Sequence, residues 1–265
     1  MTRCAWLLLL GCVGCQSCTP AVPSTPAVTA AARPTPVADP PPDVSAPESP
    51  TPPERLADPA GQADRSLVLA ALALDQGHDA EALPHLERYV AHRPDHLLAR
   101  AQLAEVLFRQ QKYAEARLHF ELFIALAQEQ GEPAFRHLVH SHSRLVEIAE
   151  AQRDAYQEHL HRGIGLYLLA CRRATEADPD GELSAEALFC RAAAALREAR
   201  QDRPREARPH WYLFLTWDRL GQRAAALRAL ADADACALMG RLTPLESRGL
   251  QTACLREADA LWRTR

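Results

Sequence analysis

Five histidines close together in the sequence are the strongest candidates for chemistry in this chain. They are His137, His140, His142, His159 and His161. On a helix, His137 and His140 share a face at i and i+3, as two metal ligands can, but the other three do not join that face. A transition-metal site needs three or four converging ligands. We therefore expect satisfied or exposed histidines and no cofactor. The alternative is an accessory or metal-binding subunit of an envelope enzyme that uses the cluster from His137 to His161.

Four cysteines in the second half of the chain are the other reactive side chains: Cys171, Cys190, Cys236 and Cys254. In an oxidising compartment they have three possible disulfide pairings, and free buried thiols are an equal alternative. The sequence contains no glycine-rich phosphate loop, no nucleophile elbow and no H-E-x-x-H pair. We therefore expect a protein that is not an enzyme.

Composition separates the chain into two kinds of sequence. Residues 61–265 are rich in Ala, Leu, Arg and Glu with few β-branched residues, which favours helix throughout. The formal net charge of −4 is spread over the chain. Because a nucleic-acid-binding protein normally carries a basic face, a nucleic-acid partner is not indicated.

A recurrence of 34 residues indicates how these helices are arranged. The segment Leu69–Leu83 matches Leu103–Arg117, and Ala82 in the first segment corresponds to Ala116 in the second. A bulky residue follows each alanine four positions later. Small residues allow two helices to approach closely, and the bulky neighbour fills the space beside them.

This pattern resembles the tetratricopeptide repeat (TPR) family. The resemblance implies an all-α, TPR-like right-handed superhelix of antiparallel helical hairpins. A further unit is visible in Trp211–Leu227, with Gly221 at the turn and Ala226 at the small position. Because Gly221 lies 144 residues after Gly77, which is not a multiple of 34, we expect the array to be irregular in the middle.

The irregular middle contains a third predicted hairpin. Leu145 lies in its first helix and the turn falls near Asp154, but Glu158 occupies the position where the family has a small residue. Gly163 and Gly165 are expected to supply the close approach instead.

Two more helices complete the prediction. A helix over Leu183–Ala199 follows a turn at Asp178–Gly181. Thr243–Glu246 forms a capping box that starts a terminal helix ending at about Arg263. We expect this helix to cap the end of the array.

In TPR proteins the first helices of the hairpins line a concave face that binds a partner peptide or helix. The resemblance places on that face nine residues: Leu98, Ala101, Glu105, Phe108, Arg109, Trp211, Leu215, Asp218 and Arg219. Aromatic and arginine side chains are common binding hot spots. The alternative is that Phe108 and Trp211 are simply core residues. A protein or peptide is the expected partner.

Residues 1–18 have the pattern of a signal peptide. The apolar run Ala5–Leu10 is far shorter than the ~20 residues that span a bilayer as a helix. Leu9–Cys12 resembles the lipobox of bacterial lipoproteins, which implies acylation of Cys12, with Cys15 as a second candidate. An ordinary secretory signal remains the alternative.

Residues 19–60 are expected to form a disordered tether, because 13 of the 41 residues from Thr19 to Pro59 are proline. Together these features predict an exported, lipid-anchored interaction scaffold in the bacterial cell envelope. Its folded part, residues 61–265, would face the periplasm or the exterior.

Overall fold

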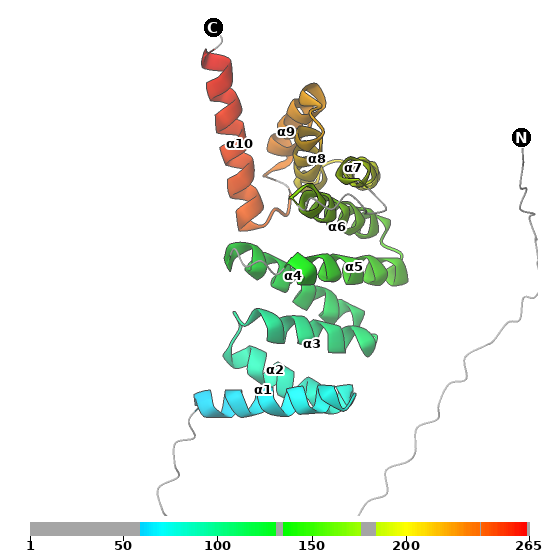
Figure 1. Cartoon of the computed structure of the whole chain (residues 1–265), viewed down its shortest axis with the longest axis vertical. Helices are drawn as coiled ribbons and strands as arrows, with labels where there is room; N and C mark the ends of the chain where they lie inside the picture. Colours follow the sequence, from blue (N-terminus) through cyan, green and yellow to red (C-terminus); the bar gives the residue numbers. More distant parts are fainter. Residues whose placement is uncertain (1–58, 131–134, 176–183, 239, 264–265) are drawn as a thin grey trace, which may run out of the picture. The chain divides into compact units, whose positions relative to one another are not determined.

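A computed structural model describes residues 59–130, 135–175, 184–238 and 240–263 (Figure 1). All of them lie in the compact unit Glu54–Arg265. The predicted signal peptide and lipobox, the tether up to residue 58 and the turn at Asp178–Gly181 lie outside the described residues.

The described part of the chain is all helical, in ten helices that pack mainly against their neighbours in sequence (Figure 1). They are α1 (Pro59–Asp75), α2 (Asp79–His92), α3 (Leu97–Arg109), α4 (Tyr113–Gln130), α5 (Phe135–Gln152), α6 (Ala155–Thr175), α7 (Ala185–Asp202), α8 (Ala207–Arg219), α9 (Arg223–Cys236) and α10 (Pro244–Arg263). The predicted all-α fold of TPR-like hairpins is confirmed. None of these helices is long and apolar enough to cross a membrane.

Four hairpin turns share one backbone conformation. Gly77 and Gly221 have φ of 75° and 68°, and Gln111 and Arg153 take the same left-handed conformation at 60° and 58°. In each turn this residue donates its N–H to the carbonyl of the residue three positions before it. The next residue donates its N–H to the carbonyl of the residue five positions before it. This is the Schellman cap, which satisfies the last carbonyls of a helix. The chain therefore reverses in the same way in α1–α2, α3–α4, α5–α6 and α8–α9.

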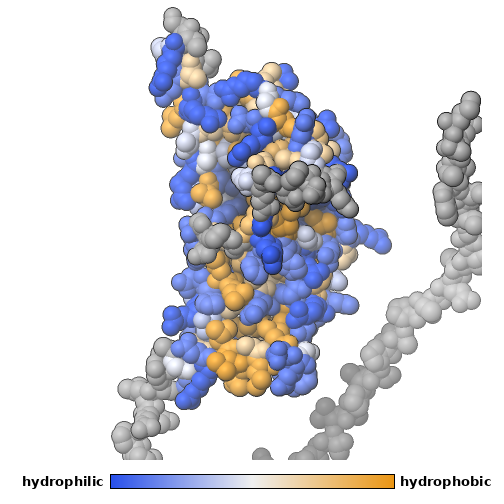
Figure 2. All heavy atoms as spheres, viewed as in Figure 1, coloured by the Kyte–Doolittle hydropathy of each residue, from blue (hydrophilic) through white to orange (hydrophobic). Residues whose placement is uncertain are grey.

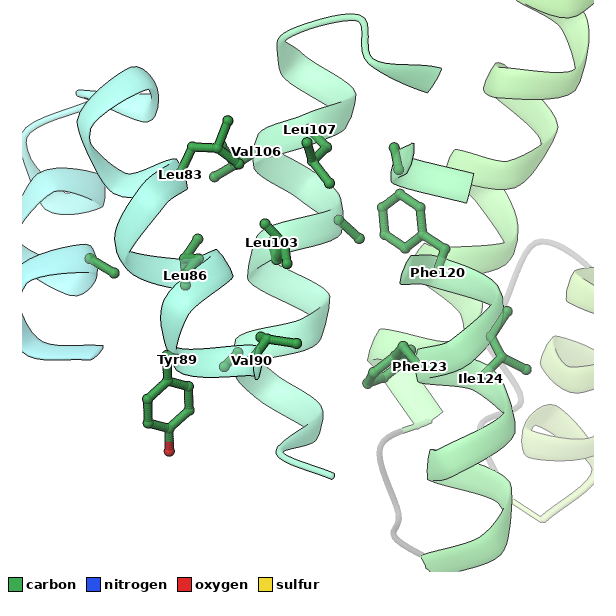
Figure 3. Close-up of a cluster of buried hydrophobic side chains, with 14 of the residues drawn as sticks. Leu83, Leu86, Tyr89, Val90, Leu103, Val106, Leu107, Phe120, Phe123 and Ile124 are labelled. Carbon is green, nitrogen blue, oxygen red and sulfur yellow. The ribbon is translucent and has the colours of Figure 1, made fainter. Parts of the chain in front are cut away.

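The small residues of the 34-residue repeat occupy helix crossings, as predicted. Ala82 and Ala116 are fully buried, and Leu86 and Phe120 fill the space beside them. Figure 3 shows Leu86, Leu103 and Phe120 in one continuous apolar cluster that runs through the first two hairpins. The register read from the repeat is therefore correct.

In the middle of the array, a glycine takes the place of the missing alanine. A Cβ atom on Gly163 would lie 2.6 Å from Cγ of Leu196, so α6 and α7 approach closely at this point. Gly165 makes only ordinary contact, since its Cβ would lie 3.5 Å from that of His142. Glu158 lies in the first turn of α6, and its carboxylate forms an ion pair with Arg162 of the same helix at 2.8 Å. The predicted close approach therefore occurs at Gly163.

The first helix leaves an apolar face uncovered among the described residues. Val68, Leu69 and Leu72 are exposed along α1. Figure 2 shows apolar side chains gathered over this end of the helical unit. An exposed apolar patch therefore lies on the outer face of the first hairpin.

Candidate binding groove between α8 and α10

Helix α8 is buried on nearly all sides in its middle turn. The four consecutive residues Trp211, Tyr212, Leu213 and Phe214 are all buried. Four consecutive residues of an α-helix point in different directions around its axis, so this turn of α8 is enclosed by its neighbours. Helices α6, α7 and α9 contact α8, and Gly249 of α10 lies against the Trp211 ring.

A buried carboxylate fixes α10 against α8. The side chain of Glu246, which is only 4% exposed, accepts hydrogen bonds from Arg208 Nε at 3.0 Å and from the Tyr212 hydroxyl at 3.0 Å. Its other oxygen accepts from the Thr243 backbone N–H at 2.8 Å, while the Thr243 hydroxyl accepts from the Glu246 N–H. The predicted capping box is thus present, and its glutamate also joins the two helices.

The charges in this contact are mutually stabilised. Burial alone would lower the pKa of Arg208, but the negative charge and hydrogen bond of Glu246, together with Tyr212 and Glu121, outweigh that effect and raise it. Burial, with the same negative charge, raises the pKa of Tyr212 well above its ordinary value. The contact therefore joins a cationic guanidinium and a neutral phenol to one carboxylate.

Between α8 and α10 lies a groove of about 550 Å³, within the range of ligand-binding sites. Its lining comes from α4 (Gln128), α6 (Tyr167, Leu168), α8 (Trp211, Tyr212, Phe214, Leu215, Asp218) and α10 (Leu245, Glu246, Arg248, Gly249, Thr252, Ala253, Arg256). A Cβ atom on Gly249 would lie 2.9 Å from Cζ2 of Trp211, so this glycine lets α10 lie directly against the indole.

The edges of the groove carry opposite charges. Asp218 is exposed at the α8 edge, where Arg223 approaches it at 3.9 Å. Arg248 and Arg256 are exposed on α10, and Arg256 also contacts Glu257 at 3.3 Å. The groove thus combines apolar walls with an acidic edge and a basic edge.

Three of the four site residues predicted on α8 line this groove. Trp211, Leu215 and Asp218 are in its wall, whereas Arg219 lies exposed at the end of α8. Trp211 is only 7% exposed, and its ring lies 5.4 Å from that of Phe214. For Trp211 the core interpretation therefore holds, although one side of the ring forms groove wall.

The residues predicted on α3 are held in contacts between hairpins. Arg109 makes two hydrogen bonds to Asp79 of α2, at 2.6 and 2.7 Å. Glu105 accepts from Arg144 of α5 at 2.9 Å, and that guanidinium lies 4.6 Å from the centre of the Phe108 ring. These side chains connect three hairpins to one another.

Leu98 and Ala101 complete the α3 set. Leu98 is 51% exposed and Ala101 is half-buried. No α3 residue contributes to the lining of the groove. The structure therefore brings the α8 residues together with α10, and it does not bring them together with the α3 residues.

The five histidines separate into different environments. His142 and His161 pair through their Nδ1 atoms at 3.1 Å. His140 contacts Glu105 at 3.0 Å, His159 contacts Asp202 at 2.8 Å, and His137 is exposed. Within the described residues, no group of three or more His, Cys, Asp or Glu is arranged to hold a metal ion.

Burial keeps the central histidine pair neutral. His142 and His161 are 1% and 2% exposed. Burial, followed by the positive charge of Arg208, lowers the pKa of His142 to about 3. Burial also lowers the pKa of His161 well below its ordinary value, and the neighbouring His142, Arg208 and Arg117 lower it further.

The four cysteines after residue 60 are free thiols in this structure. Cys190 is exposed, and Cys171, Cys236 and Cys254 are half-buried. Burial is the main cause that raises the pKa of the Cys254 thiol. The structure therefore has free thiols, as in the second alternative, but none of the four is fully buried as that alternative expected.

No protein-family model and no curated protein matches the chain. Among solved structures, "Crystal structure of MamA protein" is similar over 67% of this chain and 92% of its own, with 10% identity and a TM-score of 0.34. "MamA RS-1 ArsTM double mutant" and "MamA 41-end from Desulfovibrio magneticus RS-1" are each 16% identical over 67% of this chain and 96% of theirs. Their TM-scores are 0.30 and 0.28, a distant likeness between helical proteins.

Sequence reasoning missed the contribution of α10 to the groove. Glu246 was recognised only as a capping residue, and Gly249 was not identified at all. A glycine inside a helical segment signals a close approach, so Gly249 was the available clue. Nothing in the repeat pattern indicated that Arg208 and Tyr212 would meet Glu246.

Removing the Glu246 carboxylate should destabilise the fold strongly. Glu246→Ala leaves the Arg208 charge without its partner, and breaking a buried ion pair in this way costs about 3 to 5 kcal/mol. Urea unfolding followed by circular dichroism measures the loss. Asp259→Ala, at an exposed position of the same helix, is the matched control and should change stability by less than about 0.5 kcal/mol. Equal effects of the two substitutions would contradict the anchoring role.

The histidine pair should make stability fall in mild acid. Below about pH 6.5 the unfolded chain protonates both imidazoles. The folded chain resists this, because its pKa values are lowered. Each histidine should then reduce the unfolding free energy by up to about 1.4 kcal/mol per pH unit as pH falls from 6.5. Urea unfolding between pH 7 and pH 5 should show a slope that His142→Gln reduces. If the slope of unfolding free energy against pH is the same in His142→Gln as in the wild type, protonation of the histidine pair does not cause the loss of stability.

Proposed function

We propose that this chain is a non-catalytic protein-binding scaffold that takes an amphipathic helix of its partner in the groove between α8 and α10. The observation that carries the proposal is the groove's combination of apolar walls and oppositely charged edges. Helix-in-groove recognition places apolar anchors at i, i+3, i+4 and i+7 into such a site. The charged edges then fix the orientation of the helix.

The charges specify the partner further. Arg248 and Arg256 along α10 favour acidic side chains on one flank of the bound helix, and Asp218 favours a basic residue on the other. Leu215 is half-buried and in the groove wall, so it is available as an apolar anchor. Trp211 supports the floor but is too deeply buried to test binding independently of the fold.

The proposal includes export and a lipid anchor. It rests on the signal-peptide pattern of residues 1–18 and on the lipobox-like segment Leu9–Cys12. The proline-rich residues 19–60 would separate the scaffold from the membrane, in the bacterial cell envelope. The histidine cluster does not support a second proposal, because its members have different partners.

Blocking the groove should prevent partner capture. A photo-crosslinking amino acid at Leu215 should form an adduct with a protein in envelope extracts. Thr252→Trp should abolish that adduct, because the indole fills the groove from an exposed position of α10. Gln251→Trp places the same ring on the same helix outside the groove lining and should leave the adduct intact. Circular dichroism melts of both variants exclude unfolding as the cause.

The same experiment separates the groove from the α3 surface. Once the partner is identified, Leu215→Ala should weaken its binding by roughly tenfold, since truncation of a hot spot costs more than ~1 kcal/mol. Arg109→Ala should have little effect on that affinity. If Arg109→Ala weakens binding while Leu215→Ala and Thr252→Trp do not, the α3 surface is the binding site and the groove proposal is wrong.

The anchor has its own test. Labelling with palmitate should mark the wild-type chain, and the double replacement Cys12→Ser with Cys15→Ser should remove both the label and the membrane association. The reason is that two or three acyl chains provide most of the affinity for the bilayer. Cys190→Ser, at an exposed thiol of α7, is the matched control. Unchanged fractionation of the double variant would exclude the lipid anchor.

A further inference from the structure

A second concave space lies on the other side of Arg208 from the groove. It has a volume of about 370 Å³ and shares no lining residue with the groove. We call it the Arg-lined cavity. Its lining is Arg117, Glu121, Ile124, Ala125, Tyr156, Gln157, Leu160, His161, Arg203, Glu206, Arg208, Arg241, Leu242, Thr243 and Pro244.

All four arginines keep hydrogen-bond donors that the described residues leave open. Arg208 is bonded through Nε alone, so its two Nη groups have no hydrogen-bond partner among the described residues. Arg241 is exposed and has no hydrogen bond or ion pair with any described residue. Arg117 is bonded to Glu121 through Nε at 2.9 Å, and Arg203 reaches Asp154 through one Nη at 3.4 Å. Arg241 is thus the one arginine of the four with neither a hydrogen bond nor an ion pair among the described residues.

A buried histidine in the wall also has one ring nitrogen without a partner among the described residues. His161 uses Nδ1 to pair with His142, and its Nε2 has no hydrogen bond although it is buried. Leaving a buried polar atom unpaired is costly, so such an atom calls for a water or a ligand. Because one Nδ1 of the pair must donate and the other accept, the pair can present an N–H at His161 Nε2 when His142 Nδ1 is the donor.

The charge balance sets the ligand chemistry. Glu121 and Glu206 also face the cavity, and Asp154 and Glu246 pair with its arginines from outside the lining. The four arginines are thus matched in number by carboxylates, and non-specific attraction of anions is weak. What remains is local: planar guanidinium groups with open N–H donors, of which Arg241 has no partner among the described residues, and this geometry binds carboxylate or phosphate oxygens.

We propose that the Arg-lined cavity binds a small molecule bearing carboxylate or phosphate oxygens, held by Arg208 and Arg241 with His161 in the wall. The part of the ligand near Glu206 carries a hydroxyl or amino donor, because Glu206 has no ion pair among the described residues. This site is independent of partner binding in the groove.

Calorimetric titration of the full chain at constant ionic strength tests the site with two probes, citrate and inorganic phosphate. At least one should bind saturably at one per chain, and the tighter probe identifies carboxylate or phosphate. Arg241→Ala should weaken binding at least about tenfold through loss of a charge-assisted hydrogen bond. Arg205→Ala removes the same charge from an exposed position outside the lining, and should change the affinity less than about twofold.

Two further measurements complete the test. The ¹⁵N resonance of His161 Nε2 should shift on addition of the bound probe, and Thr252→Trp in the groove should leave the titration unchanged. The proposal is overturned if neither probe binds saturably. It is also overturned if Arg205→Ala weakens binding as much as Arg241→Ala does, because the attraction would then be a general effect of charge.

Discussion

The buried carboxylate of Glu246 holds α10 in the position that creates both concave spaces. Placing an ion pair in a nearly dry contact carries a desolvation cost, which is recovered only when hydrogen bonds satisfy the charges. Glu246 meets this condition with Arg208, Tyr212 and the Thr243 N–H. Because Arg208 faces the cavity while Tyr212 and Glu246 face the groove, a single contact forms the wall between them.

The turn that joins one hairpin to the next has the same construction on both sides of the irregular middle of the array. Before α3, Arg100 donates from Nε to the carbonyl of Pro94 at 3.2 Å, and before α8, His210 contacts the carbonyl of Pro204 at 3.0 Å. Both turns carry an arginine before the proline, Arg93 in one case and Arg203 in the other. Helix α7 therefore enters α8 as α2 enters α3, although these turns are 110 residues apart and outside the 34-residue period.

The fold was predictable from sequence wherever it depends on local spacing. Ala82 and Ala116 identified helix crossings because a small residue at a fixed place in each repeat has one packing role. The binding site was only partly predictable, because α10 lies outside the repeat and meets α8 through Arg208 and Glu246, which are 38 residues apart. The repeat pattern placed Trp211 on an open face, whereas α10 covers that face.

The shared wall determines which side chains can report on each space separately. A substitution at Arg208 or Glu246 removes part of the wall of both spaces, so we expect its effects not to add to those of neighbouring substitutions. Leu215 lines only the groove and Arg241 lines only the cavity. The two spaces therefore share one wall but differ in their lining, which is largely apolar with charged edges in the groove and carries four arginines in the cavity.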